Sequence, residues 1–226
     1  ENLSLKLEIQ AQQQLELVNK QLEARVDEQI RLFEISGQID AIRSSEDLYP
    51  RIVQMASSLT AAEKVGFFIL PPDQSHVLLI SQFGFGDLTS RFGHLMLQTD
   101  QVRKTLEGTA GHFPLRGSDI FQSEDDAPRT AEDSLYYCWP LKIRGEPFGF
   151  LATCNNRCRL DQSSVEMKLL DFLMKKAALA IENMALYESM VSNFYGILKS
   201  LVNALEAKDL YTGKHSERVT RYAYMI

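Results

Sequence analysis

Aromatic side chains that could stack a planar ligand concentrate in the middle of this 226-residue sequence. They are Phe83, Phe85, Phe92, His94, Phe113, Tyr136 and Trp139. Aromatic rings in a pocket could stack a nucleotide base, a haem or another planar molecule, and filling a hydrophobic core is their commoner role. From this group we predict Phe83, Phe92, His94, Phe113, Tyr136 and Trp139 as pocket residues. His94 or His112 as a haem ligand is a further hypothesis.

Few other residues are spaced for chemistry. Cys138, Cys154 and Cys158 form neither CxxC pairs nor an even disulfide framework, so we interpret them as ordinary thiols in a reducing, cytoplasmic protein. No nucleophile motif, phosphate-binding glycine loop or HExxH run is present. We therefore expect no catalysis by this chain itself.

Composition and charge narrow the class of protein. Hydrophobic residues make up 45% and charged residues 24% of the sequence, which is typical of a globular domain. The formal charge of -6 disfavours nucleic-acid binding, and no apolar run reaches the roughly 20 residues of a membrane-spanning helix. Both ends interrupt helical patterns, so we expect a piece of a longer protein.

Long helices are expected at both ends of the chain. Residues 1–42 lack proline, and their apolar stripe of Leu15, Leu22, Val26 and Phe33 recurs at steps of seven or four. The stripe predicts self-association, although packing on the chain's own domain is an open alternative. At the other end, a capping box at Ser163 should open a largely buried helix that runs unbroken to Asp209.

The middle of the chain reads as an antiparallel sheet with helices packed on it. A helix capped by Asp47 should span residues 47–59, and hairpins are expected at 64–83 and 135–154. A short strand at 94–97, a short helix at 100–106 and a long loop at 108–134 complete the order. The predicted fold class is α+β with long coiled-coil-type helices on either side.

Two segments in the second half of this order resemble the GAF family. Residues 177–187 (AALAIENMALY) resemble its closing AIxNAxLY-like helix, and the hairpin with Trp139-Pro140-Leu141, Gly145 and Gly149 resembles its PL…G…GxL core. GAF domains are small-molecule sensors or dimerisation modules of signalling proteins. The resemblance implies a ligand pocket among the central aromatics, with a ligand that is unknown.

Residues 204–219 (ALEAKDLYTGKHSERV) are similar to the opening of HD-GYP domains, close to ALExKDxYTxxHSxRV. Leu210 stands where proline is common in that family. Thr212 should cap a new helix, with His215 in its first turn. The resemblance implies that His215 is the first ligand of a site for two or three iron or manganese ions that hydrolyses cyclic di-GMP. Tyr211 matches a position that is acidic in three-metal members, which favours two metals.

Together these patterns predict four segments: a coiled-coil helix at 1–34, a GAF domain at 35–188, a connecting helix at 189–208 and the start of an HD-GYP domain at 209–226. The expected function is that of a sensory GAF module in a bacterial cyclic di-GMP phosphodiesterase. We expect a homodimer formed through the flanking helices. The alternatives are a ligand-free structural dimerisation module, and a regulator of an HD-type enzyme with another phosphoester substrate.

Overall fold

The computed structural model describes residues 2–71, 76–85, 95–109, 111–116, 134–154, 165–208 and 215–225. Its contacts divide the chain into two compact units, Glu1–Ile181 and Glu182–Ile226. Among the described residues, no helix combines the length and the apolar character needed to cross a membrane.

A six-stranded antiparallel sheet forms the centre of the first unit. Its strands are β1 (Lys64–Ile69), β2 (His76–Phe83), β3 (Leu95–Gln98), β4 (Phe113–Arg116), β5 (Leu135–Ile143) and β6 (Glu146–Cys154), in the order β3-β2-β1-β6-β5-β4. The predicted α+β class with an antiparallel sheet and long flanking helices is therefore confirmed. β4 was missed, because its four residues include Pro114 and lie within a stretch interpreted as loop.

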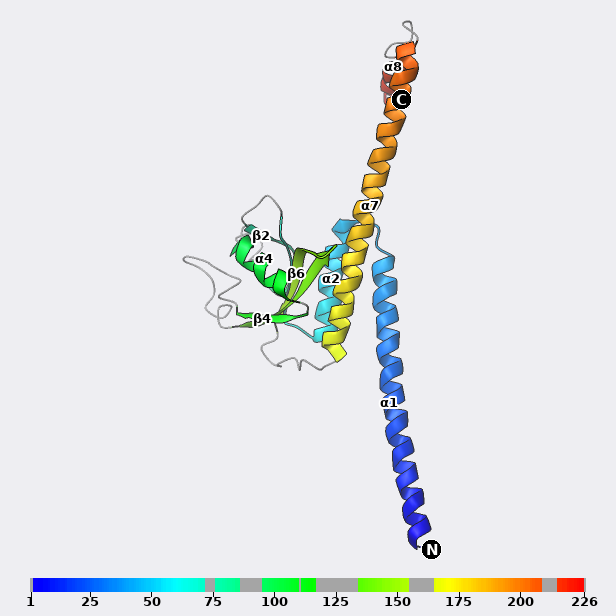
Figure 1. Ribbon diagram of the computed structural model, residues 1–226, viewed down its shortest axis with the longest axis vertical. Coiled ribbons are helices and arrows are strands. Elements are labelled where there is room, and N and C mark those ends of the chain that lie inside the picture. The colour runs from blue at the N-terminus through cyan, green and yellow to red at the C-terminus, as the bar shows by residue number, and fades with distance from the viewer. Residues whose placement is uncertain are drawn as a thin grey trace. The chain divides into compact units, whose positions relative to one another are not determined.

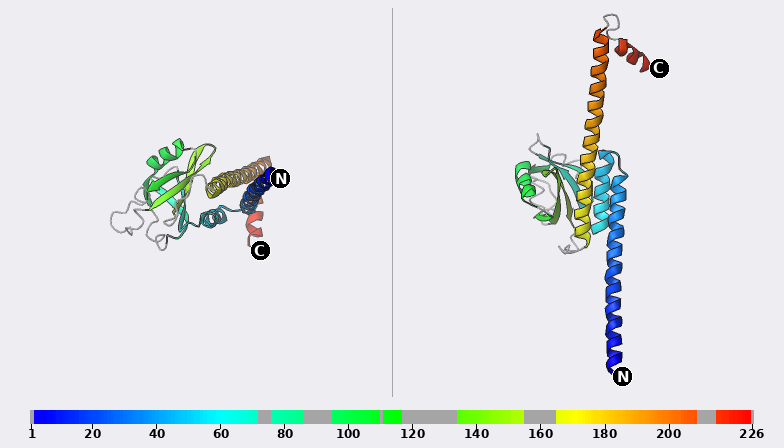
Figure 2. Two further views of the ribbon diagram at one scale, coloured as in Figure 1. Left: turned by 90° about the horizontal axis from the view of Figure 1, so that it is seen from below. Right: turned by 45° about the vertical axis from the view of Figure 1, so that its right-hand side comes forward.

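Helices cover both faces of this sheet (Figure 1). α2 (Ser45–Thr60) and the first turns of α7 (Val165–Lys208) lie on one face, and α4 (Thr99–Gly108) lies on the other. The end of α1 (Asn2–Asp40) packs outside α2 and α7 and buries Ile35 and Ile39 (Figure 2). We refer to the two sides of the sheet as the helical face and the α4 face.

The start of α2 differs from the prediction. Ser44 is the N-cap, and its hydroxyl oxygen accepts a hydrogen bond from the Asp47 backbone N–H at 3.2 Å. The same hydroxyl donates to the Asp47 carboxylate at 2.7 Å. Asp47 is therefore the N3 residue of the capping arrangement and the predicted cap was wrong. Pro50 consequently lies inside the helix, where its missing N–H removes one intrahelical bond.

Two glycines of the β5–β6 hairpin explain the pattern that suggested it. Gly145 has φ of +89° in the turn, a conformation that favours glycine. A Cβ on Gly149 would clash with the carbonyl oxygen of Phe68 on β1. Glycine there allows the β6 backbone to approach β1 closely at the centre of the sheet.

The second unit contains the rest of α7, from Glu182, and α8 (His215–Ala223). The segment of α7 in this unit is exposed along almost its whole length. α8 begins at His215, the residue predicted for the first turn of a new helix. The proposed caps Ser163 and Thr212 lie outside the described residues.

Candidate functional site

The α4 face of the sheet carries a cluster of buried aromatic and apolar side chains. Phe68 of β1 and Phe150 of β6 stack there with ring centroids 4.7 Å apart and an interplanar angle of 10°. Tyr136 of β5 lies parallel to Phe85, with centroids 6.3 Å apart. Val102 and Leu106 of α4 complete the cluster, to which all of these residues belong.

Burial in this cluster favours the uncharged forms of its tyrosine and cysteine side chains. Burial raises the pKa of the Tyr136 hydroxyl, and the neighbouring thiols of Cys154 and Cys138 raise it further. Burial also raises the pKa values of the Cys138 and Cys154 thiols. Because the thiolate is the nucleophilic form, a raised pKa lowers the reactivity of both cysteines. The α4 face therefore suits apolar or aromatic contacts rather than covalent chemistry.

α4 is fastened to the sheet by a lysine from β5. The Lys142 amine donates hydrogen bonds to the carbonyl oxygens of Thr109 at 2.9 Å and Glu107 at 3.3 Å. These carbonyls lie at the C-terminal end of α4, where a cation satisfies free acceptors and interacts favourably with the helix dipole. Lys142 therefore fixes the end of the helix that covers the α4 face.

The structure brings together only some of the predicted pocket residues. Tyr136 belongs to the α4-face cluster, and Phe113 of β4 packs against it. Trp139 lies on the helical face, as does Leu151, the residue paired with both Trp139 and Phe67. Phe67 contacts Tyr49 of α2 with ring centroids 5.1 Å apart, which identifies this face.

The remaining aromatic and histidine predictions are scattered. Phe83, at the end of β2, is 51% exposed. The His112 ring lies 5.8 Å from the Trp139 ring, between centroids, beside the edge strand β4. Phe92 and His94 lie outside the described residues. The assignment of all these side chains to a ligand pocket therefore stays a prediction.

His215 is the one predicted metal ligand, and it is the first residue of α8 as the structure describes that helix. A single histidine cannot hold the two cations that the HD-GYP resemblance implies. Within the ranges that the structure describes, no three His, Cys, Asp or Glu side chains gather as metal ligands. The described residues therefore do not form the implied metal site.

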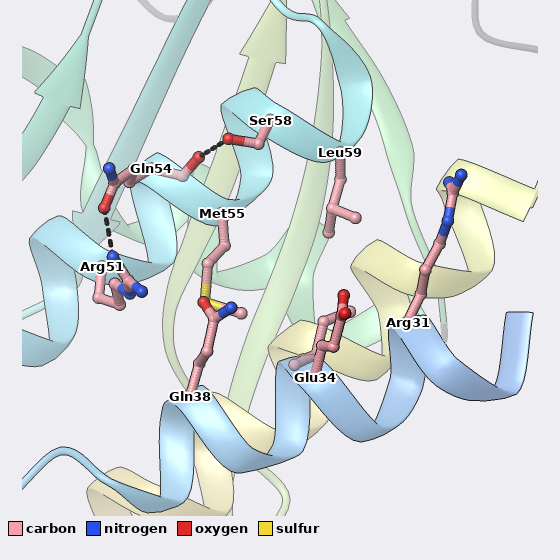
Figure 3. Close-up of a pocket in the computed structure, with 9 residues that line it drawn as sticks. Arg31, Glu34, Gln38, Arg51, Gln54, Met55, Ser58 and Leu59 are labelled. Carbon is pink, nitrogen blue, oxygen red and sulfur yellow. Dashed lines mark hydrogen bonds between the residues drawn. The ribbon is translucent and has the colours of Figure 1, made fainter. Parts of the chain in front are cut away.

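A groove of about 310 Å³ lies between α1 and α2 (Figure 3). Buried Ile35 and Met55 line the groove, and Gln38 and Glu34 of α1 point toward Met55 and Leu59 of α2. Arg51 donates a hydrogen bond to the Gln54 side-chain oxygen at 2.8 Å. The groove is thus lined by polar and apolar side chains in similar measure.

The end of α1 is joined to α7 by an ion pair. The Lys176 amine lies 3.0 Å and 3.1 Å from the two carboxylate oxygens of Asp40, and Ser36 donates a third hydrogen bond at 3.1 Å. Hydrogen bonds from Lys176 and then Ser36 lower the pKa of Asp40. This contact connects the first long helix to the last one.

Apolar side chains remain exposed along both long helices. On α1 they include every member of the predicted stripe, with Phe33 at 76% exposure. On α7 they include Leu179 and Leu186, which were expected in a largely buried helix and are about half exposed. The helical periodicity of the sequence could not reveal this exposure. A helix that packs on a core and a helix that packs on a second chain both need an apolar face.

The arrangement of sheet and helices is the GAF fold. The GAF domain of a phosphoenolpyruvate-protein phosphotransferase from Coxiella burnetii matches 73% of this chain and 98% of its own, with a TM-score of 0.54 at 15% identity. Residues 122 to 287 of a methyl-accepting chemotaxis protein match 69% of this chain and 98% of their own, with a TM-score of 0.54 at 18% identity.

A third solved structure contains a bound pigment. The phycoerythrobilin-bound GAF domain of a cyanobacterial phytochrome matches 71% of this chain and 97% of its own, with a TM-score of 0.53 at 16% identity. At such identities the likeness concerns the fold. No protein-family model matches the sequence, and no curated protein matches it.

Proposed function

We propose that this chain is a sensory and dimerising GAF module of a bacterial signalling protein. One observation carries the proposal: a GAF-type core is joined to two long helices whose apolar side chains are exposed. A long isolated helix is only marginally stable in water, and a large exposed apolar face favours association with another protein surface. A second copy of the same chain is the simplest partner that buries this face.

Light scattering tests the dimer. We expect a mass of twice the 25.7 kDa of one chain. A particle of one chain's mass at high concentration would contradict the dimer while leaving the GAF fold unaffected.

The ligand that we propose is a planar, largely apolar molecule bound at the α4 face. Support comes from the aromatic cluster around Tyr136 and from the phycoerythrobilin-bound GAF domain of similar fold. Mass spectrometry of co-purified molecules, followed by thermal shifts with nucleotides, haem and bilins, tests this idea. A ligand that binds only the folded state must raise its apparent stability.

A matched pair of variants locates the site on the sheet. Tyr136→Phe keeps the ring and removes the hydroxyl on the α4 face, whereas Trp139→Phe changes the helical face of the same strand. Only the first should alter the ligand-induced shift. If no ligand in a broad panel shifts the protein, the module is a ligand-free structural dimeriser.

Downstream, we propose control of a metal-dependent phosphodiesterase that acts on cyclic di-GMP. The support is the HD-GYP-like run at 204–219 and the start of α8 at His215. His215 would supply one ligand to iron or manganese, which activate water for attack on phosphorus when bound. Another phosphoester substrate is the alternative within the same enzyme class.

The coding sequence after Ile226 is the first test. A His-Asp pair and a Gly-Tyr-Pro run should follow, and their absence would contradict the phosphodiesterase. If they follow, the full protein should hydrolyse cyclic di-GMP, and His215→Ala should lower both metal content and activity. Hydrolysis of other phosphoesters only would favour the alternative substrate.

A further inference from the structure

The exposed part of α7 carries a regular seam. We define the α7 seam as Tyr187, Val191, Phe194, Leu198, Leu201 and Leu205, which alternate at spacings of four and three residues. An apolar repeat of seven residues predicts two helices that wind around each other with a left-handed supercoil. The seam therefore predicts a helical partner with the same repeat.

The area exposed here is large enough for a stable interface. Ten large apolar side chains between Leu186 and Leu205 are each at least 37% exposed. With whole aromatic side chains at 150–250 Å² each, this face offers on the order of 1,000 Å² of apolar surface. A typical stable interface buries about 800 Å² per partner. Burial of this face against one additional helix would therefore form an interface of typical size.

The residues beside the α7 seam and those on the opposite face of the helix also indicate a single helical partner. Met190, Tyr195, Ile197 and Val202 flank the seam and are apolar or aromatic. The opposite face carries small and polar residues, namely Ser192, Asn193, Gly196, Lys199, Ser200 and Asn203. Charged residues at such flanking positions set partner choice and orientation. Glu188 is the one charged flanking residue between Tyr187 and Leu205, so almost no repulsion between like charges opposes pairing with an identical helix.

We propose that the α7 seam pairs with the α7 seam of a second copy, parallel and in register. This inference rests on the dimer in the proposed function and assigns its contact residues. In a parallel pair, the GAF cores precede the seams at the same end of the paired helices. An antiparallel pair would separate the cores by the length of the seam, about 28 Å for 19 residues.

The α1 stripe has a different period from the α7 seam. Leu22 and Phe33 are eleven residues apart, as are Leu15 and Val26. An eleven-residue repeat leaves helices nearly straight or slightly right-handed. The aromatic layers of Tyr187 and Phe194 provide the bulky, matched contacts that fix one alignment of α7 on its copy.

Cysteine cross-linking of the full chain tests this pairing. In a chain with Cys158→Ser, single cysteines replace Leu198, Leu201 or Leu205 in the seam, and Lys199 or Asn203 on the opposite face as matched controls. After mild oxidation, the three seam variants should form covalent dimers and the two controls should remain largely monomeric on non-reducing gels. The unmodified background, with its buried Cys138 and Cys154, should not cross-link.

The outcomes separate this inference from the proposed function. Leu205→Cys can link to itself only in a parallel pair, because an antiparallel pair places it opposite the start of the seam. A dimer by light scattering without this cross-link overturns the inference and leaves the proposed dimer intact. Equal cross-linking of seam and control variants, or covalent species larger than dimers, also overturns it. A monomeric protein overturns both.

Discussion

The two parts of α7 have similar apolar content and opposite environments. In the first part, Met167, Leu170, Leu173 and Ala177 are buried in the first unit. In the second part, residues of the same types remain exposed, with Leu201 at 57%. The first part of this continuous helix therefore packs in the core of its own chain. By our proposal, its last part packs against a second chain. Identical leucine side chains should respond differently to the same substitution in the two parts.

Leu173→Ala and Leu201→Ala are the most direct test of this comparison, and the first should have the largest effect. Leu173 is fully buried. Its truncation should lower the free energy of unfolding by about 2–5 kcal/mol, because it removes burial and leaves a cavity. Leu201→Ala should instead weaken the dimer. Chemical denaturation at several protein concentrations measures both effects.

The dependence on protein concentration distinguishes the two leucines. The deficit of Leu173→Ala should persist at all concentrations, since it lies within one chain. The deficit of Leu201→Ala should be small at low protein concentration, where both proteins are monomeric, and should grow as the concentration rises above the dissociation constant of the unmutated dimer. Equal, concentration-independent losses would show that both parts of α7 are covered by their own chain.

Gly149→Ala should disrupt the sheet that the buried part of α7 covers. A Cβ at this position would meet the carbonyl oxygen of Phe68, which belongs to the backbone and cannot rotate away. We expect a loss of about 1–3 kcal/mol in the free energy of unfolding, as for other overpacked interiors. Gly108→Ala is the control, because an added Cβ meets nothing within 4 Å there. Equal Tm values for both variants would contradict the close approach of β6 and β1.

Alternation along the chain was sufficient to predict most of the sheet. The β5–β6 hairpin was evident from β-rich runs on either side of a glycine turn, and the same logic found β1 and β2. β4 was missed because four residues with an internal proline carry almost no periodicity. Its pairing with β5 depends on tertiary contacts that the local sequence does not encode.

The candidate site was less predictable than the fold. Tyr136 and Trp139 are three residues apart on one strand, so their side chains must point to opposite faces. This odd spacing was present in the sequence, and it places the two predicted pocket residues on opposite faces of the sheet. The α7 seam was also visible as a heptad spacing, but only the exposure of its side chains in the structure distinguishes an interface from a core.

Gly196→Ala sharpens the comparison from the exposed side. Gly196 lies on the polar back of the α7 seam, and an added Cβ meets nothing within 4 Å. Alanine should stabilise this part of the helix by about 0.5–1 kcal/mol, because glycine loses more backbone entropy on folding. Circular dichroism during thermal unfolding measures the gain. Gly37→Ala in α1 is the matched substitution, as this helical glycine is equally open. A loss of stability in Gly196→Ala would show that the polar back is covered.

The ion pair between Asp40 and Lys176 should have the smallest effect, and it varies with pH. Because the pKa of Asp40 is lowered in the folded state from 3.8, its contribution to stability is present above that value. The contribution decreases as the pH falls through the lowered pKa, where the carboxylate gains a proton. Asp40→Asn should therefore lower the Tm slightly near neutral pH and have no effect in strong acid.

An exposed pair contributes little, so the pH dependence is the decisive observation rather than the size of the shift. Asp27→Asn, on the exposed part of α1, provides a control for the removal of one charge from the same helix. If the two variants have parallel pH profiles, Asp40 acts only through net charge. If only the Tm difference caused by Asp40→Asn disappears in acid, the ion pair with Lys176 stabilises the contact between the end of α1 and the buried part of α7.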